Sequence, residues 1–209
     1  MATVRSFRTV AERCRHEPEK IKGSRHIATV APVDDDAAIA AVLGEVAREF
    51  PAANHHAYGW RLGADGARFR YSDDGEPSGS AGAPILQQID HLELTRVLVV
   101  VSRIFGGTKL GTGGLIRAYG GAAREALAHA TIVERVLTAA VEIVHGYAQA
   151  GAVAAALHAE GQKPRLAEYG EQTRLVIDVP LDRVEPFAQE LRDATGGRAA
   201  IAIEWPADD

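Results

Sequence analysis

Three carboxylates lie close together in the stretch YSDDGEPSGSAG, residues 71–82. Asp73, Asp74 and Glu76 fall within four residues. Carboxylate oxygens are the ligands that Mg²⁺ prefers, and a single carboxylate can act as a general base. The plainer interpretation is that Asp and Ser side chains bond to nearby backbone N–H groups and fix a tight loop. The residue types favour this second interpretation, and the candidate contact residues of the loop are Asp73, Asp74, Glu76 and Ser78.

A second candidate is the glycine-rich stretch RIFGGTKLGTGGLIRAYGG, which has seven glycines in residues 103–121. A strand that ends in a glycine-rich turn before a helix presents backbone N–H groups to an anion. The spacing, however, matches neither the phosphate loop nor the dinucleotide fingerprint. Three interpretations stay open: phosphate binding, close packing of another segment against bare main chain, and a contact surface for another ligand. The candidate residues are Arg103, Gly106, Gly107, Lys109, Gly111, Gly113, Gly114 and Arg117.

We expect the two stretches to converge on one recognition surface, with the 71–82 loop lying against the bare main chain of the glycine turn. A small basic cluster, called the basic edge below, consists of Lys20, Lys22 and Arg25. We expect its side chains to be solvated and not to contact RNA. His55 and His56 are adjacent on a predicted strand and point to opposite faces, so they cannot share one metal ion. No catalytic residue, metal site or cofactor is therefore assigned, and Mg²⁺ enters only if the protein is an enzyme.

The charge is unevenly spread over the 209 residues, which carry a net charge of −5. Residues 138–209 have 6 Lys and Arg against 12 Asp and Glu, whereas residues 1–137 have 17 against 16. Because phosphate binding needs clustered cations, any nucleic-acid contact is predicted for the first part. No apolar run approaches the roughly 20 residues of a membrane span, so we expect a cytoplasmic protein without a membrane partner.

Hydrophobic periodicity predicts two domains, 1–134 and 138–206. In the first, the run at 95–105 is rich in β-branched residues and predicts a strand buried on both faces. The other predicted elements of this domain are a strand at 27–33, a helix at 34–50, a hairpin at 55–72 and helices at 84–89 and 115–127. In the second domain, strands and helices follow the order βαββαβ, which is the ferredoxin-like arrangement.

The two loop stretches together resemble the paired signature of the IMPACT/YigZ family. YSDDGEPSGSAG is followed by VVVSRIFGGTKLGTGGLIRAYGGAAREAL, and IKGSRHIA and NHHAYGWRLG resemble the upstream blocks of that family. The resemblance covers residues 21–130. Residues 138–205 are similar to the companion domain of bacterial members, which resembles a ferredoxin-like domain of elongation factor G.

This resemblance implies an α+β protein whose first domain has the α/β sandwich fold of the second domain of ribosomal protein S5. It also implies a role near translation, because eukaryotic relatives restrain a stress kinase that controls translation initiation. Our first hypothesis is a non-catalytic regulatory protein that binds RNA, ribosomes or a translation factor through the face with the two glycine-rich loops. This hypothesis does not include recognition of a DNA sequence. The alternatives are an enzyme acting on a phosphorylated small molecule or nucleotide, and a protein-interaction module that uses the open ferredoxin-like sheet.

Overall fold

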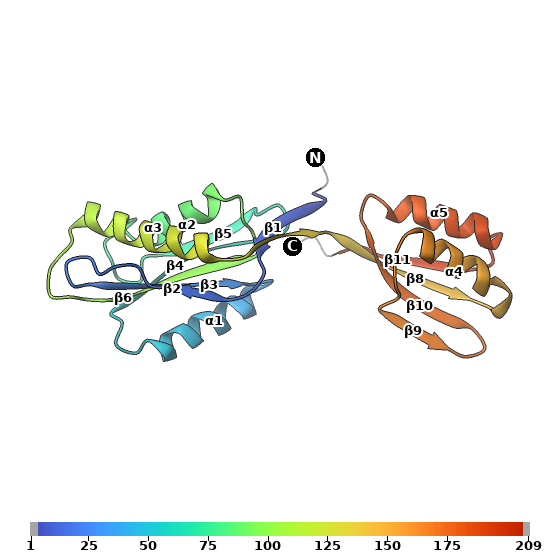
Figure 1. Ribbon diagram of the computed structural model, residues 1–209, viewed down its shortest axis with the longest axis horizontal. Coiled ribbons are helices and arrows are strands. Elements are labelled where there is room, and N and C mark those ends of the chain that lie inside the picture. Colours follow the sequence, from blue (N-terminus) through green and yellow to red (C-terminus); the bar gives the residue numbers. More distant parts are fainter. Residues whose placement is uncertain (1–3, 207–209) are drawn as a thin grey trace. The chain divides into compact units, whose positions relative to one another are not determined.

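The chain folds into two compact units, shown in Figure 1 by a computed structural model that describes residues 4–206. The first unit runs from Ser6 to Arg135, and the second contains Val4, Arg5 and residues 136–206 of the described chain. No helix within the described residues is long and apolar enough to cross a membrane.

Strand β6 (Val97–Ile104) is the centre of the five-stranded sheet of the first unit. Every residue from Val97 to Arg103 is buried, as the β-branched-rich run predicts. The sheet is antiparallel throughout, in the order β2-β3-β6-β4-β5. The remaining strands are β2 (Cys14–His16), β3 (Arg25–Pro32), β4 (His55–Leu62) and β5 (Arg68–Ser72).

Helices cover both faces of this sheet (Figure 1). Helices α2 (Gly82–His91) and α3 (Thr112–His129) lie on one face, and α1 (Asp36–Glu49) lies on the other. Side chains of a strand alternate between faces, so Val99 packs under α2 and α3 while Leu98 packs against the α1 side. This double cover explains why β6 shows no polar face.

Three strands were not predicted from the sequence, namely β2 at the edge of the five-stranded sheet and two strands outside that sheet. β1 (Ser6–Val10) and β7 (Ile132–Val136) form a separate two-stranded sheet. The Ser6 hydroxyl donates to Glu134 at 2.5 Å across a separation of 128 residues. Because the two partners are so distant in sequence, no local periodicity announces their pairing.

The second unit has the ferredoxin-like fold, and the α+β fold class expected from the sequence is confirmed. Its sheet is antiparallel in the order β11-β8-β10-β9. One face packs on two helices, and Phe187 and Leu191 are fully buried there. The elements are β8 (Thr138–His145), a 3₁₀ turn (Tyr147–Gln149), α4 (Ala150–Ala159), β9 (Leu166–Tyr169), β10 (Thr173–Pro180), α5 (Val184–Thr195) and β11 (Ala200–Glu204).

A close approach of two main-chain segments explains why Gly106 of the glycine-rich stretch is a glycine. A Cβ on Gly106 would come within 1.9 Å of the carbonyl carbon of Gly23. The Gly106 N–H also donates to Ser24 Oγ at 3.1 Å. The segment that lies against the glycine turn is therefore the turn at Ile21–Ser24, and our expectation that the 71–82 loop fills this place is wrong.

Replacing Gly106 by alanine tests this contact. We expect the Gly106→Ala variant to lose about 1–3 kcal/mol of unfolding free energy, because the added methyl meets fixed backbone. Gly121→Ala is the matched control, since a Cβ there has no neighbour within 4 Å. In the middle of α3 it should gain about 0.5–1 kcal/mol. Urea unfolding followed by circular dichroism measures both, and equal stability of the two variants would contradict the packing argument.

Candidate functional site

Both glycine-rich loops contribute to one cleft of about 520 Å³ in the first unit. Glu76 and Pro77 come from the first loop, and Arg103, Phe105 and the segment 109–112 come from the second. Asn54 and His55 at the start of β4 and Leu115 of α3 complete the lining. The fold thus brings together two stretches that are far apart in sequence.

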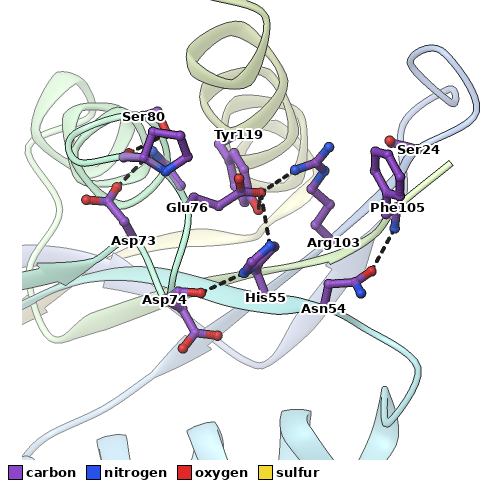
Figure 2. A network of polar contacts seen from close by, with 12 residues as sticks. Ser24, Asn54, His55, Asp73, Asp74, Glu76, Ser80, Arg103, Phe105 and Tyr119 are labelled. Atoms are coloured by element: carbon purple, nitrogen blue, oxygen red, sulfur yellow. Dashed lines mark hydrogen bonds and ion pairs between the residues drawn. The ribbon is translucent and has the colours of Figure 1, made fainter. Parts of the chain in front are cut away.

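A buried ion pair forms the floor of this cleft (Figure 2). Arg103 Nη1 lies 2.5 Å from Glu76 Oε1, and the side chains of the two residues are only 7% and 4% exposed. The Tyr119 hydroxyl donates to the same carboxylate oxygen at 2.7 Å. His55 Nε2 lies 3.9 Å from it. Glu76 is therefore an anchor for groups around it and not a free ligand or base.

The sheet register places Arg103 in a row with one histidine on each neighbouring strand. Arg103 on β6 is paired with His26 on β3 and with His55 on β4. The Tyr119 ring meets His26 edge to face at a centroid distance of 5.3 Å. Neither His26 nor Tyr119 was a predicted site residue.

Burial decides the protonation states in this row. Burial and then repulsion from Arg103 lower the pKa of His26 to about 4. Both ring nitrogens of His26 are buried without a hydrogen-bond partner among residues 4–206, as is Arg103 Nε. Burial and the hydrogen bond to Glu76 raise the pKa of Tyr119, so its hydroxyl stays a donor.

Asp73 holds the N-terminal end of α2. Its carboxylate accepts hydrogen bonds from the backbone N–H groups of Gly79, Ala81 and Gly82 at 2.8–2.9 Å. Burial alone would raise the pKa of Asp73, but the three backbone hydrogen bonds together lower it. This confirms the plainer interpretation of the acidic loop for this residue.

Asp74 ties the loop to strand β4. Its carboxylate accepts from the His56 N–H at 2.6 Å, and its carbonyl oxygen lies 2.7 Å from His55 Nδ1. Together with the engagement of Asp73 and Glu76, this removes the basis for a shared Mg²⁺ site. No group of three His, Cys, Asp or Glu residues in the described part of the chain is arranged to hold a metal ion. Ser78 is exposed near the tip of the loop.

The two adjacent histidines point to opposite faces, as predicted. His55 lines the cleft, whereas His56 Nδ1 lies 2.9 Å from the Ser102 hydroxyl on the other side of the sheet.

The candidate residues of the second loop separate into different roles. Lys109 is exposed and lines the cleft, and Gly107 and Gly111 have positive φ angles of 88° and 73° at the approach to α3. Gly113 and Gly114 lie in the first turn of α3. Arg117 does not line the cleft but borders a separate groove with Gln88 and Arg124. Its Nη1 nevertheless lies 3.8 Å from the position that a Cβ on Gly113 would take.

The basic edge is next to the second loop. The contact between Gly23 and Gly106 places the exposed Lys22 beside it. Arg25 is neutralised, because its guanidinium bonds to both oxygens of Glu17 at 2.6 and 2.8 Å. Lys20 and Lys22 have no ion-pair partner within residues 4–206. The predicted cluster is therefore reduced to two available lysines.

The ion pair at the cleft floor gives a stability prediction. Arg103→Ala leaves the Glu76 carboxylate buried without its cation, and we expect a loss of about 3–5 kcal/mol of unfolding free energy. The Arg103→Ala, Glu76→Gln double variant should lose less unfolding free energy than the two single variants lose together, because it no longer contains a buried carboxylate without its cation. Denaturant unfolding of the four proteins measures this coupling. Additive losses would show that the two side chains do not depend on each other.

His26 gives a prediction on pH. The pKa of His26 is about 4 in the folded protein, whereas its ordinary value, which applies to the unfolded chain, is 6.5. Between these values the unfolded chain binds more protons, so stability is full above pH 6.5 and is lost as the pH falls toward 4. The full loss from this group is about 3 kcal/mol. His26→Leu should have a flatter profile of unfolding free energy against pH over that window, and parallel profiles would rule the effect out.

Comparison with known proteins agrees with this two-unit organisation. The family model described as Impact N-terminal domain matches residues 22–127, and the model described as Domain of unknown function (DUF1949) matches residues 129–198. IMPACT family member YigZ of Escherichia coli is 35% identical over 189 residues, which cover 89% of this chain and 93% of that protein. IMPACT family member YvyE of Bacillus subtilis is 31% identical over 94% of this chain and 90% of its own length.

A solved structure supports the same conclusion. The structure described as "Crystal structure of an hypothetical protein" covers 99% of this chain and 100% of its own chain, with 31% identity and a TM-score of 0.71. Since sequence models, curated relatives and a solved structure agree over almost the full length, the chain belongs to the IMPACT family.

Proposed function

We propose that this protein binds RNA through the rim of the cleft, as a non-catalytic, translation-associated protein of the cytoplasm. The observation that carries the proposal is an uncapped helix N-terminus that opens into the cleft among cations without ion-pair partners. The resemblance to a family whose eukaryotic members act on translation initiation makes RNA of the translation machinery the first partner to test.

The N-terminal end of α3 is suited to an anion. The helix has 18 residues, its N-cap Gly111 offers no side-chain hydrogen bond, and no acidic residue lies in its first turn. The first N–H groups of a helix lack partners within the helix, and the helix dipole adds positive potential there. Thr112, Gly113 and Gly114 carry these groups, and Gly111 and Thr112 line the cleft. A phosphate at this place would satisfy donors that the chain leaves open.

Two cations without an ion-pair partner within residues 4–206 lie near this helix end. Many arginines of the first unit are neutralised by carboxylates, in the pairs Arg13–Glu45, Arg15–Glu49, Arg25–Glu17, Arg61–Asp90 and Arg68–Asp36. Lys22 and Lys109, in contrast, are exposed and have no ion-pair partner within the described residues. Local charge of this kind, and not the net charge of the chain, decides where a polyanion binds.

The two alternatives receive no such support. The enzyme alternative gave the acidic loop a metal-binding or general-base role, but Asp73, Asp74 and Glu76 are already bonded to backbone N–H groups or to Arg103. On the second unit, the charged side chains of the sheet neutralise one another, since Arg174 bonds to both Glu142 and Glu168.

Removing two positive charges at different places tests the proposal. We expect Lys22→Ala with Lys109→Ala to weaken RNA binding by about tenfold and to lower the slope of log K against log salt by about 2. Arg48→Ala with Arg70→Ala is the control with the same net charge. Both arginines are exposed, lie outside the cleft and have no ion-pair partner within residues 4–206. Fluorescence anisotropy with labelled RNA over a salt series measures both variants.

Absence of RNA binding by the unmodified protein at about 50 mM salt would refute the proposal, since nonspecific electrostatic binding is strongest at low salt. Equal weakening by both double variants would show that the RNA does not contact this rim.

A further inference from the structure

We infer that the cleft receives one unpaired nucleotide of a single-stranded RNA, with its base stacked on Phe105. The inference rests on the proposed function and deepens it, because it states which form of RNA the site accepts. It depends on an exposed aromatic ring, on polar groups left open beside it and on the position of the α3 N-terminus.

Phe105 is a large apolar side chain that the fold leaves uncovered. It is 45% exposed and lines the cleft, on a loop whose next residues are Gly106 and Gly107. Most large apolar side chains of the first unit are buried in the two cores on either side of the sheet. An exposed ring at the rim of a cleft offers a flat surface on which any base can stack.

The main chain that carries the ring is held in place before a ligand arrives (Figure 2). The Phe105 N–H donates to Asn54 Oδ1 at 3.0 Å, and the Asn54 N–H donates to the carbonyl oxygen of Arg103 at 2.8 Å. The Arg103 guanidinium lies 5.5 Å from the centroid of the ring and is fixed in turn by Glu76. A fixed platform loses little conformational freedom on binding, so more of the stacking energy appears as affinity.

Polar groups beside the ring match the edge of a base. Asn54 Oδ1 is occupied by the Phe105 N–H, which leaves the Asn54 amide NH₂ to donate. Arg103 also lines the cleft, but its Nη1 is bonded to Glu76 and its Nε is buried, so it supports the ring and does not read the base. His55 Nδ1 faces the Asp74 carbonyl oxygen, which can only accept, so Nδ1 carries the hydrogen and Nε2 is the acceptor in the neutral ring. Unpaired bases are recognised by stacking and by hydrogen bonds of this kind to their edges.

The same cleft also contains the phosphate end of the site. Lys109, Gly111 and Thr112 line it together with Phe105. A nucleotide in the cleft therefore meets an aromatic surface for its base and the α3 N-terminus for its phosphate. A base inside a duplex is stacked on both faces and paired on its edge, so it cannot use these groups.

The test compares one RNA of about 12 nucleotides as a single strand and annealed to its complement. We expect the unmodified protein to bind the single strand about tenfold more tightly than the duplex, measured by fluorescence anisotropy at one salt concentration. Phe105→Leu should weaken single-strand binding about tenfold and leave duplex binding unchanged. Phe105→Tyr retains the ring and should retain the affinity.

Phe69→Leu is the matched control. Phe69 is 54% exposed and also has an arginine near its ring, with Arg61 at 5.0 Å from the centroid, but it does not line the cleft. It should bind both RNAs as the unmodified protein does. Equal affinity for single strand and duplex, or equal effects of Phe105→Leu and Phe69→Leu, would overturn this inference while RNA binding itself stands. No binding of either RNA would overturn the proposed function and this inference with it.

Discussion

The buried ion pair between Arg103 and Glu76 connects the two loops on which the site depends. Arg103 is the penultimate residue of the central strand, and Glu76 lies in the loop after β5. Removing both charges from water is costly, so neither side chain is stable at this depth without the other. The Tyr119 hydroxyl adds a third connection, to α3. The cleft is therefore part of the fold, and its shape is set by the same contacts that keep the loops in place.

The glycines of the second loop answer several separate constraints. Gly106 is required by the main chain of Gly23, whereas Gly107 has no neighbour near its Cβ position and is required by its positive φ angle. Gly111 has a positive φ angle at the N-cap of α3 and leaves the helix end without a side chain that would block it. The stretch therefore differs from a phosphate loop in spacing because its glycines are not all directed at one ligand.

Local patterns predicted the central strand, most helices and the ferredoxin-like order, since each follows from periodicity within one segment. Pairings between distant segments were not predictable, such as β1 with β7 or Arg103 with Glu76, because the sequence does not show which charges meet. Arg117 could have been placed better. It lies two positions from Leu115 and Tyr119, which face the sheet, and residues two apart do not share a helix face.

The pairing of charges also explains how a chain with a net charge of −5 can offer a site to a polyanion. An arginine that bonds to a carboxylate contributes little field beyond its own pair, because opposite charges at short range cancel at a distance. The field at the cleft is then set by the few cations that have no such partner and by the end of α3. The excess of carboxylates in the second unit is unfavourable for a polyanion, which is why the proposed RNA contact lies on the first unit. Net charge is therefore a poor guide to binding here, whereas the positions of unpaired charges are informative.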